Sequence, residues 1–133
     1  MVTTSLAELG TLFFKEQDRL LGGPNEALCA PNYTAYITSF PPMNLAGHQQ
    51  FAKAFYAAFP DLVHNIQETI AEDNRVAVRN VLSGTHTGDF MGIPATNRTV
   101  HVGAMMVLHV EDGRVVRLYG QFDQAGLMRQ LAT

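Results

Sequence analysis

Side chains able to move protons share odd-numbered positions near the end of the chain, at His101, His109, Tyr119 and Asp123. In an extended strand, residues two apart point to the same face of the sheet. An imidazole or carboxylate can act as a general acid or base, and a phenol can donate to a developing oxyanion. Met105 has the same parity and would add an apolar wall. The pattern therefore indicates a ligand pocket, with a solvent-facing sheet surface as the alternative.

The register of the last hairpin decides which of these side chains meet. The turn at Glu111–Arg114 fits a two-residue type I′ turn or a type I turn with Gly113 as a bulge residue at positive φ. Only the bulged register places the apolar residues of both strands on one face and the polar residues on the other. We therefore predict the bulged turn, which sets Asp123 opposite His101 and Tyr119 opposite Met105.

Other candidate site residues lie earlier in the chain. Asn80 alternates with apolar neighbours, so we expect it on an inward face, where a buried amide needs partners. His86 lies in a Gly-rich turn and either fixes that loop or contacts a substrate. Tyr36 offers a second phenol, with core packing as its alternative. His48 and His64 are expected at the surface.

A metal site is not expected. His101 and His109 share a face but would lie about 27 Å apart along the strand, so they cannot hold one ion together. No other pair of ligand-type residues has the spacing of a metal site.

Composition and charge exclude several classes of function. The 133 residues are 47% apolar and 16% charged, which is typical of a globular protein, and we expect a single domain over residues 1–133. The net charge of -3 and the lack of a basic run argue against nucleic acid as a partner. No apolar stretch approaches the roughly 20 residues that span a membrane. With one cysteine and no signal-peptide pattern, we expect a cytoplasmic protein.

Caps and periodicity predict the elements that would position these residues. A capping box at Ser5 and Glu8 opens the first helix, and Asn44 is a cap for a later one. Helices are predicted over 5–22, 24–28, 44–60 and 124–131, and strands over 62–71, 75–83, 99–110 and 114–122. Helices followed by a meandering antiparallel sheet indicate an α+β fold.

Several segments resemble one known family. They are Phe59-Pro60-Asp61, the Gly84–Gly88 stretch Gly-Thr-His-Thr-Gly with Met91-Gly92-Ile93-Pro94 after it, and the ending Val110–Val116 followed by Asp123. Together they resemble the SnoaL-like polyketide cyclases of the NTF2-like superfamily. The similarity runs from about Tyr33 to Leu131.

This resemblance implies a cone formed by a curved, mostly antiparallel sheet packed against N-terminal helices. It also implies a deep pocket, a homodimer, and neither a metal nor an organic cofactor. Cyclases of this type close a polyketide ring by intramolecular aldol condensation. Asp123 matches their acid–base aspartate, and His109 is the nearest match to an assisting histidine. We therefore predict that Asp123 lines a closed pocket, with capping of the last helix as the alternative.

The chain also departs from the family pattern. Tyr36 stands where a pocket histidine is common, and Asn80 and Tyr119 stand where many members have tryptophan. These departures leave the scaffold intact and change the lining of any pocket. Residues expected to contact a substrate are Tyr36, Asn80, His86, His101, Met105 and Tyr119.

Three functions are consistent with these residues. The first is a cofactor-independent cyclase or isomerase that acts on a small apolar carbonyl compound by proton transfer. The second is a non-catalytic module that binds a small apolar ligand or a partner protein. The third, an epoxide hydrolase, ranks lowest because its Asp-Arg-Asp cluster would need a second inward aspartate beside Arg117 and Asp123.

Overall fold

The computed structural model describes residues 5–132 and contains one six-stranded sheet with helices packed against it. The elements in chain order are α1 (Leu6–Leu20), the 3₁₀ turn η1 (Glu26–Leu28), β1 (Cys29–Ile37), β2 (Met43–Asn44), α2 (Leu45–Ala58), β3 (Val63–Glu72), β4 (Arg75–Thr85), β5 (Thr99–Glu111), β6 (Arg114–Phe122) and α3 (Gln124–Ala132). The α+β fold and all four predicted strands are confirmed. The helix expected over 24–28 is only the single turn η1.

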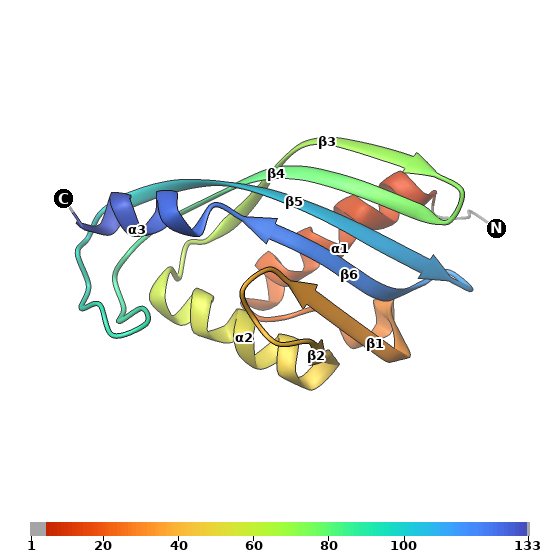
Figure 1. Ribbon diagram of the computed structural model, residues 1–133, viewed down its shortest axis with the longest axis horizontal. Coiled ribbons are helices and arrows are strands. Elements are labelled where there is room, and N and C mark those ends of the chain that lie inside the picture. Colours follow the sequence, from red (N-terminus) through yellow and green to blue (C-terminus); the bar gives the residue numbers. More distant parts are fainter. Residues whose placement is uncertain (1–4, 133) are drawn as a thin grey trace.

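The strands lie in the order β2-β1-β6-β5-β4-β3 (Figure 1). Strands β3 to β6 form the predicted antiparallel meander. The sequence did not predict β1, which runs parallel to β6 and places Tyr36 beside Tyr119. Among residues 5–132 its antiparallel partner is the two-residue strand β2, which is too short to give a hairpin pattern in the sequence.

Side-chain caps fix the beginnings of the two long helices. The Ser5 hydroxyl accepts from the Glu8 amide at 3.1 Å, and the Asn44 side chain accepts from the Gly47 amide at 2.8 Å. Both bonds satisfy amides that the first helical turn leaves without partners, as predicted. Helix α1 ends at Leu20, and the following residue, Leu21, caps it with a left-handed φ of 54°.

The predicted register of the last hairpin is wrong. Asp112 and Gly113 both have positive φ, at 51° and 76°, so the turn is the two-residue type I′ turn. Positive φ at Gly113 is confirmed, but the bulge lies after the turn, where Val115 and Val116 are both buried. This bulge shifts the later pairs by one residue and restores the separation of polar and apolar faces. Tyr119 therefore pairs with Val107, and the Asp123 amide donates to the Gly103 carbonyl at 3.0 Å.

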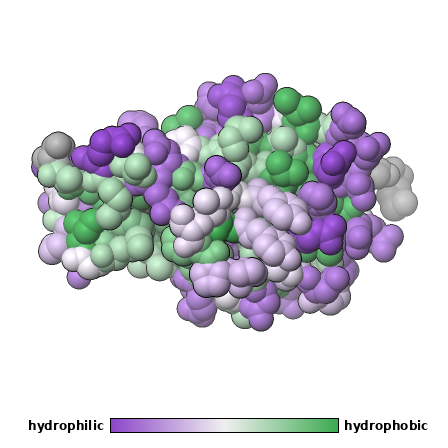
Figure 2. Space-filling view, in the orientation of Figure 1, coloured by the Kyte–Doolittle hydropathy of each residue, from purple (hydrophilic) through white to green (hydrophobic). Residues whose placement is uncertain are grey.

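The sheet has an inner face that carries the core and an outer face that lies open. Figure 1 shows α1 behind the strands, α2 below them and α3 at the end near the C-terminus. The inner face packs against α1 through Phe13, Phe14, Val78, Leu108 and Leu118. On the outer face, hydrophobic and hydrophilic residues are mixed (Figure 2). The odd-numbered residues of β5 and, beyond the bulge, those of β6 from Arg117 onward point this way. The polar face predicted from the sequence is thus the outer face.

Candidate functional site

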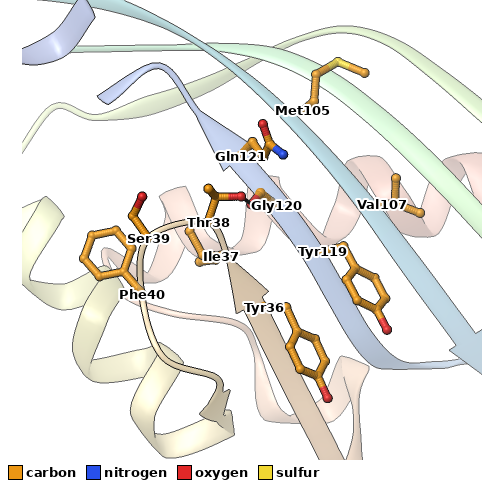
Figure 3. A pocket seen from close by; sticks show the side chains of 10 residues that line it. All are labelled: Tyr36, Ile37, Thr38, Ser39, Phe40, Met105, Val107, Tyr119, Gly120 and Gln121. Atoms are coloured by element: carbon orange, nitrogen blue, oxygen red, sulfur yellow. Dashed lines mark hydrogen bonds between the residues drawn. The ribbon is translucent and has the colours of Figure 1, made fainter. Parts of the chain in front are cut away.

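The outer face carries an open groove of about 440 Å³ that several expected site residues line (Figure 3). Tyr36 and Tyr119 stack with ring centroids 5.0 Å apart, and they are 39% and 42% exposed. Met105 and Gln121 border the groove on the side of β5 and β6. These residues come together as expected, but on a solvent-facing surface rather than in an enclosed pocket.

The two outer-face histidines are not part of this groove. His109 packs edge-on against Tyr119, and burial together with the positive charges of Arg117 and Arg75 lowers its pKa. His101 is exposed, and its backbone amide and carbonyl both bind the side-chain amide of Gln130 at 2.8 and 2.9 Å.

Asp123 caps the last helix instead of lining a closed pocket, which corrects the prediction. Its carboxylate accepts from the Gly126 amide at 2.9 Å, and the side chain is exposed. A Cβ atom at Gly126 would collide with this carboxylate, so the glycine makes the close approach possible. Asp123 and His109 lie about 20 Å apart along the strands, because six residues separate Gly103, the partner of Asp123, from His109. They cannot act on one small substrate together.

We expect Asp123→Ala to lower the free energy of unfolding by about 1 kcal/mol, because the first turn of α3 loses its cap. Asp123→Asn is the matched control, since asparagine caps nearly as well and should stay close to wild type. Urea denaturation of both variants measures the difference. An unchanged midpoint for Asp123→Ala would contradict the capping role.

A second cavity, which we call the inner cavity, lies between the inner face of the sheet and helices α1 and α2. Its volume is about 60 Å³. Its walls are mainly apolar, with Phe14, Phe51, Met106, Leu118 and Phe122 among them. Four polar residues also line it: Gln17, His48, Tyr56 and His64. Apolar walls with a few placed polar groups are typical of ligand sites.

Asp18 joins two of these polar residues into a hydrogen-bonded cluster. Its carboxylate accepts from the Tyr56 hydroxyl at 2.6 Å, from His64 Nδ1 at 2.7 Å and from the His64 backbone amide at 2.8 Å. The side chains of Asp18 and His64 are only 13% and 8% exposed. An ionised carboxylate can only accept a hydrogen bond, so His64 carries a proton on Nδ1, the nitrogen that faces Asp18. The other ring nitrogen, Nε2, is left for a ligand.

The electrostatics of this cluster keep Asp18 ionised. Burial alone would raise the pKa of the Asp18 carboxyl, but the interactions with His64 and the hydrogen bond from Tyr56 together outweigh it and lower that pKa. Burial and the bond to Asp18 in turn raise the pKa of the Tyr56 hydroxyl, which stays protonated as a donor. An imidazole oriented by an anionic carboxylate is the arrangement that general acid–base catalysis uses.

The other histidine of the inner cavity has a different partner. His48 Nδ1 lies 2.8 Å from the Tyr33 hydroxyl, and the two rings stack with centroids 5.9 Å apart. Burial, with a smaller contribution from the neighbouring His64, lowers the pKa of His48 to about 4. His48 and His64 are 5% and 6% exposed, so the expectation that they lie at the surface is wrong.

The remaining candidates lie on the inner side of the sheet but outside the cavity lining. Asn80 is 1% exposed on β4, and both of its amide atoms lack a partner within residues 5–132. His86 is fully buried, stacks on Phe59 and uses Nδ1 to contact the hydroxyl and amide of Thr96 at 3.0 and 3.2 Å. This geometry corresponds to the loop-fixing alternative for His86.

The described part of the chain shows neither a cluster of metal ligands, nor a reactive thiol, nor a membrane-spanning helix. Within residues 5–132, no three His, Cys, Asp or Glu side chains are grouped as metal ligands. Burial and the charge of Glu26 raise the pKa of Cys29 to about 12, so its thiol stays protonated. In the same residues, no helix has both the length and the apolar character needed to cross a membrane.

The fold recurs in solved structures. A SnoaL-like polyketide cyclase candidate from Jannaschia sp. CCS1 aligns with a TM-score of 0.83 at 17% identity, covering 100% of this chain and 98% of that one. AclR, a candidate hydroxylase from Streptomyces galilaeus, aligns with a TM-score of 0.82 at 24% identity over 92% and 81% of the two chains. IdmH, a candidate polyketide cyclase from Streptomyces antibioticus, has a TM-score of 0.76 at 26% identity over 94% of each chain.

A search of curated protein sequences finds no match to this chain. The sequence model of one family does match, over residues 24–131. The matched part includes α2 and the whole sheet, and therefore every residue that lines the outer groove and the inner cavity except those of α1. The overall fold also agrees with that of the SnoaL-like structure from Jannaschia sp. CCS1. The chain therefore belongs to the SnoaL-like polyketide cyclase family.

Proposed function

We propose that this protein is a cofactor-independent cyclase or isomerase that moves a proton next to a carbonyl group, and that it does so in the inner cavity. The observation that carries the proposal is the Asp18–His64–Tyr56 cluster at the wall of an apolar cavity. A dry cavity strengthens electrostatic interactions with the reacting atoms. The cluster supplies a proton acceptor there without a metal ion.

The proposed step begins with neutral His64. Its Nε2 lone pair takes the proton from the carbon next to the carbonyl, the C–H electrons form the C=C bond of an enolate, and the carbonyl π electrons move to oxygen. Asp18 keeps the imidazole in the correct tautomer and stabilises the imidazolium that forms. In a β,γ-unsaturated carbonyl compound the enolate is a dienolate, and the proton returns to its γ carbon, which moves the C=C bond and isomerises the substrate. In ring closure the enolate carbon bonds to a second carbonyl carbon, and the oxygen of that carbonyl takes the proton.

The size of the inner cavity favours a small substrate. A cavity of about 150 Å³ holds benzene, and the inner cavity has about 60 Å³. Phe122 is shared with two adjoining cavities of about 20 and 70 Å³, so movement of this ring would join the three spaces. A small uncharged carbonyl compound is therefore the expected class of substrate.

The family resemblance implies Asp123 or His109 as an alternative acid–base residue, each acting alone because about 20 Å separates them, with Tyr36, Met105 and Tyr119 as contacts in the outer groove. The homodimer also stays a prediction. If it forms, the partly apolar outer face around Tyr119 is the surface we expect it to cover.

Deuterium exchange of butanone in D₂O, followed by proton NMR, tests the proposal. Butanone is small and apolar, and its α-protons exchange slowly without a catalyst. We expect wild type to accelerate exchange, and His64→Gln to reduce the acceleration by at least about 100-fold, the lower range for a general base.

His101→Gln is the matched control, because it makes the same substitution at an exposed histidine on the other face of the sheet. Circular dichroism of each variant establishes that it is folded. Equal rates for wild type and His64→Gln, or no exchange above the buffer rate, would contradict the proposal and favour a non-catalytic ligand-binding module.

A further inference from the structure

His48 and His64 line the same inner cavity but have opposite hydrogen-bonding partners. His64 faces a carboxylate, which only accepts, whereas His48 faces the hydroxyl of Tyr33, which can donate. An imidazole whose Nδ1–H donates to an acceptor presents a bare Nε2 to a ligand, whereas an imidazole whose Nδ1 accepts from a donor presents an Nε2–H group.

The tautomer of His48 follows from the burial of Tyr33. Tyr33 is 2% exposed, and the contact of its hydroxyl is the 2.8 Å approach to His48 Nδ1. If Nδ1 carried the proton, the Tyr33 hydrogen would lie in the core without an acceptor, which costs about 1–3 kcal/mol. A proton on Nε2 instead lies at the wall of the inner cavity, where a ligand can accept it. Tyr33 therefore donates to Nδ1, and the ring proton of neutral His48 lies on Nε2.

The Nε2–H group of His48 is then an unused donor at the cavity wall. Within residues 5–132, no hydrogen bond joins His48 Nε2 to another group, and the ring lines the inner cavity. Burial keeps the ring neutral, with a pKa of about 4. A neutral imidazole can polarise a carbonyl and hold the negative charge of an enolate oxygen.

We propose that His48 donates its Nε2–H to the carbonyl oxygen of the substrate while His64 moves the proton on the neighbouring carbon. This inference rests on the proposed function and assigns the second group of the same site. Tyr33 is a positioning residue, because it acts through His48. Arginine and lysine do not line the inner cavity, so its ligand is an uncharged carbonyl compound rather than a carboxylate.

The first test is the tautomer itself. Long-range proton–nitrogen NMR correlations of ¹⁵N-labelled histidine should show His48 protonated at Nε2 and His64 protonated at Nδ1. Adding butanone should shift the Nε2–H resonance of His48. A His48 ring that carries its proton on Nδ1 would overturn the inference.

The second test is butanone exchange by variants that remove the donor. His48→Phe would leave the Tyr33 hydroxyl without a partner, so the double variant Tyr33→Phe/His48→Phe keeps the fold by removing both polar groups. We expect kcat to fall by about 100-fold with little change in KM, because the donor acts mainly on the charge that develops in the transition state.

The outcomes separate this inference from the proposed function. Loss of exchange in His64→Gln but unchanged kcat in the double variant would overturn the role of His48 and leave the proposed function standing. No loss in His64→Gln would overturn both.

Discussion

Lowering the pH from about 6.5 to 4 is expected to reduce the free energy of unfolding by about 3 kcal/mol through His48 alone. In the unfolded chain this histidine takes up a proton near pH 6.5, whereas in the fold its pKa is about 4. Between these values the unfolded state binds more protons, so stability falls as the pH falls. Below pH 4 both states are protonated, and the contribution of His48 no longer changes. Urea denaturation at pH 7, 5.5 and 4 measures the loss.

The double variant Tyr33→Phe/His48→Phe isolates the source of this pH dependence. Without the buried imidazole, the free energy of unfolding should change much less between pH 6.5 and 4. Asp18 cannot produce the same window, because its lowered pKa places the loss of its contribution below pH 3.8. An equally steep loss in the double variant would show that His48 is not the cause.

Asp18→Ala is expected to lower the free energy of unfolding by about 3 kcal/mol at pH 7. Three donors lose their acceptor: the Tyr56 hydroxyl, His64 Nδ1 and the His64 amide. Leaving one buried donor without its acceptor costs about 1–3 kcal/mol, and the 13% exposure of Asp18, which lets water reach some of the three donors, favours a total near 3 kcal/mol. Urea denaturation measures the change.

Asp61→Ala provides a matched control for this substitution. The Asp61 carboxylate also accepts hydrogen bonds, from the Thr85 amide and hydroxyl at 2.7 and 2.9 Å, but it is exposed. Water can replace it as the acceptor, so its removal should cost only about 1 kcal/mol. Equal costs for the two variants would contradict the account of the Asp18 cluster.

The elements of the fold were predictable where local signals act. Ser5 and Asn44 cap their helices through side-chain oxygens, and alternation marks β4 to β6. The register of the last hairpin was not predictable in the same way. The bulge at Val115 and Val116 consists of two apolar residues, and either turn type with one bulge separates the faces equally well.

The candidate site was less accessible to sequence reasoning because its parts are distant in the chain. Asp18 and His64 are 46 residues apart and meet only when α1 packs against β3. A register irregularity between Ile66 and Glu68 also breaks the alternation that would have marked His64 as inward. One sequence signal did point to a polar group in the interior. Gln17 follows Phe13 by four residues, which places this polar side chain on the buried stripe of α1.

The prediction of an enclosed pocket around Tyr119 and Asp123 was wrong for a related reason. Parity correctly grouped Tyr119 with Asp123, but it cannot tell which face of a sheet the helices cover. That choice follows from how α1 and α2 pack. The family resemblance then attached a catalytic role to the group that lies outside.

The central claim, that ligands bind in the inner cavity, is tested most directly by two adjacent methionines. Met106 lines the inner cavity and is 7% exposed, whereas Met105 lines the outer groove and is 51% exposed. Labelling the methionine methyl groups with ¹³C gives one NMR signal for each methionine, so the signals of Met105 and Met106 report on the two faces separately during a titration with butanone. We predict that the Met106 methyl shifts and shows a nuclear Overhauser contact with butanone while the Met105 methyl is unchanged. A shift and contact at Met105 with Met106 unchanged would contradict the account and place the ligand on the outer face.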